Sequence, residues 1–191
     1  NNMFYEAGAT YHIYNRSNEM LFYSRENYIY FLKKIRNNIL PFADVLAYCL
    51  MPNHFHIIAT VKAEGVVYKG QMQRLSFSIG NMISGFTKGI NTQLDRKGVL
   101  FAHKTKAKML NDAGNDYLLN CFMYVHQNPY LAKLVEKIED WEFSSFPDYI
   151  GIRKGTIPNI QLGLEMLQLS QSEIYDLTYT ILQDKEDEDF L

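Results

Sequence analysis

The residues with the clearest potential for chemistry are His54 and His56, which flank Phe55 at the head of a β-like run. Because side chains alternate between the two faces of a strand, the two imidazoles should project together while Phe55 points into a core. Imidazole is the commonest protein ligand of metal ions. The spacing therefore indicates either a two-histidine metal site or two hydrogen-bonded histidines near the end of a strand.

A second candidate group lies in the segment 124–129, where Tyr124 and Asn128 are four residues apart. Residues at this spacing lie above one another on a helix, so the phenol and the amide should share a face. His126 should face elsewhere and serve the structure. The chain has 14 tyrosines, most of which must be packing residues, so spacing alone does not single out Tyr124 as catalytic.

The hydrophobic pattern predicts the elements that would position these groups. Strands are expected over 10–15, 44–51, 55–61 and 99–107, and helices after Ser24 as far as Pro41, over 75–93, and from Asp116 to near Pro129. The segment 64–70 reads as a loop. The order β, α, β, β, α, β, α is that of the split βαβ arrangement, an α+β fold with an antiparallel sheet. We expect helices on one face of this sheet and an open face for a ligand.

The chain is expected to divide into a core domain, 1–151, and a helical extension, 152–191. The stretch 151–155 resembles a linker, and Ser170 followed by Glu173 resembles a capping box before a terminal helix. The extension ends in an acidic tail, in which residues 184–189 hold five acids and one base. Such a tail is either a solvated end or a strip that mimics DNA and occupies a basic groove.

Composition places the chain among globular proteins, because its 191 residues are 47% hydrophobic and 21% charged. No apolar run approaches the length that a bilayer requires, and the start lacks the layout of a signal peptide, so we expect a soluble, cytoplasmic protein with no membrane partner. Cys49 and Cys121 form no Cys-x-x-Cys pair. Buried thiols are therefore a simpler explanation than a disulfide framework or a zinc ribbon.

The net charge of -2 would ordinarily argue against a nucleic-acid partner, but the charges are segregated. Without residues 184–189 the chain holds 18 basic and 16 acidic residues. The stretch 88–108 is basic apart from Asp95, and it predicts either a phosphate-binding stripe or an ordinary solvated surface. The candidate DNA-binding residues are Arg16, Lys88, Arg96, Lys97, Lys104, Lys106 and Lys108.

Three segments in order, 11–16, 50–56 and 124–129, closely resemble the successive motifs of the single-tyrosine HUH transposases, particularly the REP-associated tyrosine transposases. The resemblance runs from about residue 11 to residue 149. It implies a ferredoxin-like or RRM-like sheet, a divalent metal bound by His54 and His56, and cleavage of single-stranded DNA by Tyr124 on a helix. Asn128 occupies the place of a third, amide-type ligand. One departure is Ala102-His103-Lys104, where relatives commonly carry a Gly-Arg step.

The activity implied by the resemblance is cleavage and rejoining of single-stranded DNA at hairpin-bearing sites, such as repeated palindromes, through a covalent 5′-phosphotyrosine intermediate. The cofactor would be Mg²⁺ or Mn²⁺, and the protein would act as a monomer or a homodimer. Two other functions fit the same residues. One is a non-catalytic module of RRM-like fold that binds single-stranded nucleic acid, and the other is a metallohydrolase that activates water and does not need Tyr124.

Overall fold

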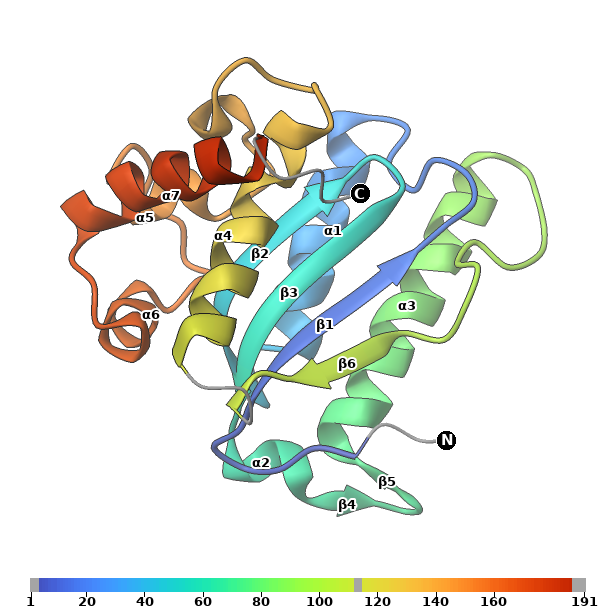
Figure 1. The fold of residues 1–191 in the computed structure, drawn as a ribbon. Helices are drawn as coiled ribbons and strands as arrows, with labels where there is room; N and C mark the ends of the chain where they lie inside the picture. The colour runs from blue at the N-terminus through green and yellow to red at the C-terminus, as the bar shows by residue number, and fades with distance from the viewer. Residues whose placement is uncertain (1–3, 112–114, 187–191) are drawn as a thin grey trace.

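The computed structural model describes residues 4–111 and 115–186, with a four-stranded sheet at the centre (Figure 1). The strands lie in the order β2-β3-β1-β6, and each neighbouring pair is antiparallel, which confirms the expected α+β class and antiparallel sheet. The elements that form the sheet and its cover are β1 (Thr10–Arg16), α1 (Arg25–Asn38), β2 (Ala43–Met51), β3 (His54–Val61), α3 (Arg74–Gln93), β6 (Lys106–Met109), α4 (Asn115–Leu131), α6 (Ile160–Leu167) and α7 (Gln171–Glu186). Shorter elements are α2 (Ala63–Val66), β4 (Tyr68–Lys69), β5 (Met72–Gln73), a 3₁₀ turn (Ile138–Asp140) and α5 (Phe146–Tyr149).

The pairing of β1 with β3 decides which side chains share a face of the sheet. Tyr14 lies opposite His56 and Arg16 lies opposite His54, so these four side chains project from the same face. Phe55 projects from the other face, where it is fully buried. The alternation read from the sequence is therefore present in the fold: one face is mostly apolar, and the other carries the histidines.

Helices α1 and α3 cover the apolar face. At the start of α1 the side chain of Asn27 accepts a hydrogen bond from the backbone N–H of Ser24, as expected for a capped N-terminus. Gly89 of α3 lies close to the ring of Tyr30 on α1, and a Cβ at that position would come within 2.9 Å of the ring. The core between these helices and the sheet includes Ile13, Phe31, Ile35, Phe55, Ile57, Ile79, Met82 and Phe86.

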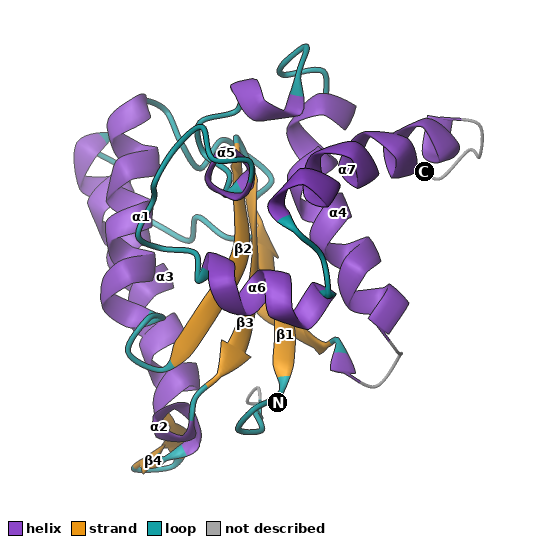
Figure 2. Ribbon diagram, turned by 90° about the vertical axis from the view of Figure 1, so that its left-hand side faces the viewer, coloured by secondary structure: helices purple, strands orange, loops and turns teal. Residues whose placement is uncertain are grey.

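The second face of the sheet is also covered, but only in part. Figure 2 shows α4 and α7 on the side of the sheet away from α1 and α3, and α6 contacts both β2 and α4. Helices therefore lie on both faces, which corrects the expectation that they occupy one face only. The cause is β2, whose residues are almost all buried and which needs an apolar cover on each side. A second apolar cluster fills this space and includes Leu46, Ala47, Cys49, Met51, Ile58, Phe122, Met123 and Ile174.

Two features predicted from the sequence, the extent of the fourth strand and the loop 64–70, are wrong. The fourth strand is predicted over 99–107 but spans only Lys106–Met109, because Leu100 and Phe101 insert into the core of the first face. The helix predicted to end near Pro129 ends at Leu131, two residues beyond the proline. A proline removes one backbone donor, and the turn is still closed by a hydrogen bond from the N–H of Ala132 to the carbonyl of Asn128. The predicted loop 64–70 contains part of α2 and all of β4.

The C-terminal part of the chain packs on the second face through α6 and α7. Helix α7 contains the terminal helix that the capping box predicts, and it continues to Glu186. Residues 187–191 of the acidic tail lie outside the described residues. In the described ranges, no helix is both long enough and apolar enough to cross a membrane.

Arg153 ties the chain just beyond residue 151 to the sheet. Its guanidinium donates to the carboxylate of Asp148 at 2.6 Å, to the carbonyl of Ser144 and to the hydroxyl of Tyr48 on β2. The side chain of Asp148 is only 1% exposed, and it also accepts a hydrogen bond from the backbone N–H of Gly155. A buried carboxylate held in this way depends on its positively charged partner.

Replacing Arg153 with Met should lower the free energy of unfolding by about 3 kcal/mol, because the carboxylate of Asp148 is then buried without a counter-charge. Urea denaturation followed by circular dichroism measures this loss. Arg25→Met is the matched control, because Arg25 pairs with Glu142 at 2.8 Å on the exposed surface and its removal should have little effect. Equal losses in the two variants would contradict the prediction.

Candidate functional site

The side chains of His54 and His56 on β3 line a pocket of about 290 Å³ beside α4. We call this the histidine pocket, and it is lined by Tyr14, Asn15, Arg16, His54, His56, His103, Lys106 and Tyr124. The lining comes from β1, β3, β6, α4 and the segment before β6. The fold therefore brings His54, His56 and Tyr124 to one site from positions that are about 70 residues apart in the sequence.

Tyr124 reaches the pocket because α4 runs along the border between the covered and the open part of the second face. Its ring meets that of His56 edge to face, with 5.5 Å between the centroids and 76° between the planes. The side chain is 40% exposed, whereas its neighbours Met123 and Val125 are fully buried. The phenol thus lies at the mouth of the site and not in the core of the helix cover.

Asn128 lies one helical turn beyond Tyr124. Its amide nitrogen donates to the backbone carbonyl of Tyr124 at 2.7 Å, which fixes the orientation of the amide. Burial, followed by the positive charge of Arg16, lowers the pKa of His54, while a hydrogen bond with Asn128 acts in the opposite direction. The amide of Asn128 is therefore the third polar group beside the two imidazoles.

His56 is almost completely buried, and its two ring nitrogens differ. Nδ1 lies 2.8 Å from Nε2 of His12 on β1, whereas Nε2 is buried and has no hydrogen-bond partner among the described residues. Burial lowers the pKa of His56 well below its usual range, with smaller contributions from His12 and His54. A neutral imidazole with an unused buried nitrogen fits a metal ligand, because coordination would satisfy the atom that the protein leaves without a partner.

The imidazoles of His54 and His56 and the amide of Asn128 would suit a divalent metal ion of intermediate softness. Imidazole nitrogens and an amide oxygen suit such ions better than they suit a soft ion that prefers thiolates. Within the described ranges, no cluster of three His, Cys, Asp or Glu side chains is placed to hold a metal. The amide of Asn128, which is hydrogen-bonded with His54, is a further polar group next to the two imidazoles.

His126 does not reach the histidine pocket. It is fully buried, and its Nε2 lies 2.7 Å from the hydroxyl of Ser145. Its ring packs against Phe122 with 4.4 Å between the centroids, and burial lowers its pKa to about 3. This is the structural role that its position on the helix predicts.

The seven basic residues expected to contact DNA do not form one surface. Arg16 and Lys106 line the histidine pocket. Lys108 lies in an adjoining pocket, with its ammonium 4.7 Å from the ring centroid of Tyr117. Lys104 is exposed in the segment before β6. The other three residues, Lys88, Arg96 and Lys97, line a separate pocket at the C-terminal end of α3.

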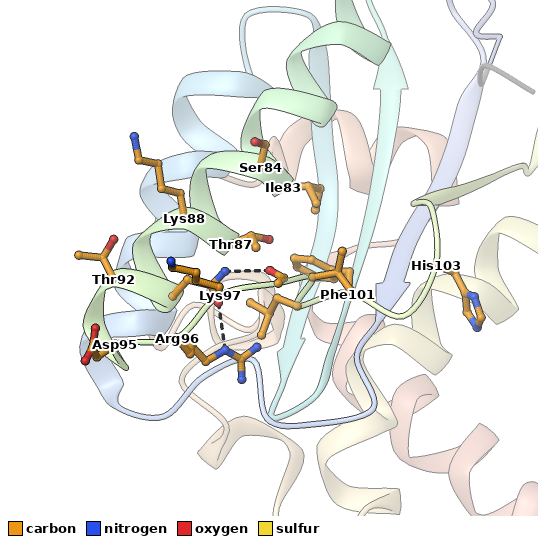
Figure 3. A pocket seen from close by; sticks show the side chains of 14 residues that line it. Ile83, Ser84, Thr87, Lys88, Thr92, Asp95, Arg96, Lys97, Phe101 and His103 are labelled. Atoms are coloured by element: carbon orange, nitrogen blue, oxygen red, sulfur yellow. Dashed lines mark hydrogen bonds between the residues drawn. The ribbon is translucent and has the colours of Figure 1, made fainter.

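This second pocket, which we call the α3 pocket, has a volume of about 810 Å³ and is lined by residues 83–101 of α3 and the following loop, together with His103 (Figure 3). His103 lines both pockets, and Figure 3 shows its ring turned away from α3. Arg96 is already paired: its guanidinium nitrogens lie 2.5 and 2.7 Å from the carboxylate oxygens of Glu19. Its charge is therefore largely compensated within the protein.

Sequence reasoning missed His12. It lies on the same face as Tyr14 and Arg16, and its ring stacks on that of Tyr14 with 4.7 Å between the centroids. Burial, helped by the nearby charge of Lys108, lowers its pKa to about 4. The alternation of His12, Tyr14 and Arg16 with the buried residues of β1 was the available signal.

Comparison with solved structures shows a likeness in fold. No family model matches the sequence, and no curated protein does. The structure resembles that of a REP-associated tyrosine transposase bound to a REP hairpin, with a TM-score of 0.55 over 76% of this chain and 81% of the other, at 18% identity. The two chains share a fold.

Proposed function

We propose that this protein is a single-tyrosine HUH transposase or nuclease that cleaves and rejoins single-stranded DNA through a covalent 5′-phosphotyrosine intermediate. The observation that carries the proposal is the position of Tyr124, which lies edge-on to His56 in a pocket shared with His54. The shared fold with a transposase bound to a DNA hairpin supports it. The substrate would be single-stranded DNA that carries a hairpin, such as a repeated palindrome.

In the proposed reaction, the phenolic oxygen of Tyr124 forms a bond with a backbone phosphorus while the bond from that phosphorus to the 3′ oxygen breaks. The phenol loses a proton to a base or to solvent, and the leaving 3′ oxygen gains one. Arg16 and Lys106 line the same pocket, where they would offset the charge of the phosphate. Because one phosphodiester replaces another, a second 3′-hydroxyl can reverse the step without nucleotide hydrolysis.

His54, His56 and Asn128 are the residues that would hold a divalent ion. When bound, the ion would supply Lewis-acid stabilisation of the charge on the phosphate. Two imidazoles favour manganese over magnesium by softness, whereas a phosphate-rich site suits either ion. We therefore propose Mn²⁺ or Mg²⁺ as the cofactor.

All the residues of this site come from one chain, so a single copy holds both the phenol and the metal-binding groups. We propose that the HUH domain spans 1–151 and that 152–191 is an extension, of which α6 and α7 pack on the second face. The protein would then act as a monomer, or as a homodimer in which each copy has its own site.

A second function is favoured by the open part of the sheet. Tyr14 and His12 stack on this surface, and Lys106 lies opposite Tyr14 on β6. Sheets of RRM-like fold use exposed aromatic and basic side chains in this position to bind single-stranded bases. The same protein could therefore bind single-stranded nucleic acid without any chemistry.

Replacing Tyr124 with Phe should abolish covalent adduct formation on a hairpin-bearing single strand, because the phenyl ring has no oxygen to attack phosphorus. Adducts formed in the presence of Mn²⁺ are resolved by denaturing gel electrophoresis, and binding is measured in parallel by fluorescence anisotropy. Tyr175→Phe is the control, because Tyr175 on α7 is also 40% exposed but lies away from the pocket. Binding should be retained in both variants.

Each rival function gives a different result in this experiment. A metallohydrolase would still cleave the strand in the Tyr124→Phe variant. A binding module would form no adduct in the unaltered protein, although it would bind the same oligonucleotide. Either result would overturn the proposed covalent mechanism.

Replacing Arg16 with Ala should weaken binding of single-stranded DNA and reduce the slope of log K against log salt by about 0.7, the value for one lost phosphate contact. Arg96→Ala should change both quantities much less, because Glu19 already compensates its charge. Anisotropy titrations between low and moderate salt measure both. A larger effect at Arg96 than at Arg16 would show that DNA follows the α3 pocket instead.

A further inference from the structure

His12 makes a specific contact with the back of the proposed metal site. Its Nε2 lies 2.8 Å from Nδ1 of His56, and the two rings are nearly parallel, with 5.0 Å between their centroids. The contact bridges β1 and β3 diagonally, because His12 is paired with Ile58 in the sheet. The contact uses Nδ1 of His56 and leaves Nε2, which is buried and has no hydrogen-bond partner among the described residues.

Two neutral imidazoles in hydrogen-bond contact share a single proton between their facing nitrogens. If His12 donates, His56 must carry its own proton on Nε2, and that atom cannot bind a metal. If His56 donates from Nδ1, its Nε2 keeps a free lone pair. The direction of this one hydrogen bond therefore decides whether His56 can act as a ligand.

His54 offers a comparison in which the direction is settled. Its Nδ1 lies 2.7 Å from the amide oxygen of Asn53, which can only accept. Nδ1 of His54 must therefore carry the proton, and Nε2 has the lone pair. The second ring nitrogen of a metal-binding histidine is usually fixed by a carboxylate, a carbonyl or water in this way.

We propose that His12 is a positioning residue, which accepts the Nδ1 proton of His56 and so holds the Nε2 lone pair of His56 ready for a divalent metal ion. The inference rests on the proposed metal site of His54, His56 and Asn128. His12 itself does not bind the ion. It acts through His56, by fixing the tautomer and the plane of that ring.

The first test measures the affinity of the metal-free protein for Mn²⁺ by isothermal titration calorimetry, without DNA. His12→Leu removes the acceptor and should weaken binding by about 10- to 100-fold. His12→Gln retains an acceptor oxygen and should recover most of the affinity. Thr10→Val is the control, because it removes another side-chain hydrogen bond between β1 and β3, the one that joins the hydroxyls of Thr10 and Thr60 at 2.8 Å, and should leave Mn²⁺ binding unchanged.

The second test reads the tautomer directly from long-range ¹H–¹⁵N spectra of the histidine rings, with Zn²⁺ as a diamagnetic probe. His56 should carry its proton on Nδ1 both before and after Zn²⁺ is added, and this preference should be lost in His12→Leu. Circular dichroism and thermal melting confirm that each variant is folded. A merely structural role for His12 would change the melting temperature without changing the tautomer.

The outcomes separate this inference from the proposed function. If the unaltered protein binds Mn²⁺, and His54→Ala abolishes binding while folded His12→Leu does not weaken it, the role of His12 is wrong and the metal site stands. A proton on Nε2 of His56 in the unaltered protein would also overturn the role of His12. If the unaltered protein binds no Mn²⁺, both the metal site and the inference fail.

Discussion

The register of β1 against β3 determines what the open face of the sheet displays. With Tyr14 opposite His56 and Arg16 opposite His54, the polar side chains of both strands share one face. A shift of one residue would exchange the two faces, exposing Phe55 and placing both histidines among the apolar side chains of α1 and α3. The burial of Phe55 therefore stabilises the register, and through it the hydrogen-bond contact between His12 and His56.

The partial cover of the second face explains why the site lies where it does. Strand β2 is apolar on both faces, and α4 packs against the face that α1 and α3 leave uncovered. Helix α4 buries Met123, Val125 and His126 but leaves Tyr124 exposed, because the helix lies at the edge of the covered region. A helix packed over the middle of the sheet would have covered both histidines, and a helix farther from the sheet would not have brought Tyr124 within reach of His56.

The parts of the structure that follow from local periodicity could be predicted from the sequence. The hairpin of β2 and β3, the helices α1 and α3 and the shared face of His54 and His56 are of this kind, because each depends on the spacing of neighbouring residues. The pairing of Arg96 with Glu19 could not be predicted, since it joins residues 77 positions apart whose approach depends on the finished fold. The contact of His12 with His56 likewise depends on the strand register, and the short β6 on the insertion of Phe101 into the core.

The hydrogen bonds that hold α4 in place have a consequence for a DNA strand attached to Tyr124. Around that residue, His126 is bonded to Ser145, and Gln127 donates to the backbone carbonyl of Thr178 on α7 at 2.7 Å. Two buried hydrogen bonds therefore hold α4 next to the residue that carries the phenol. A DNA end joined to this phenol would be held in place after cleavage, so the exchange of strands would require the nucleic acid to rearrange around a stationary attachment point.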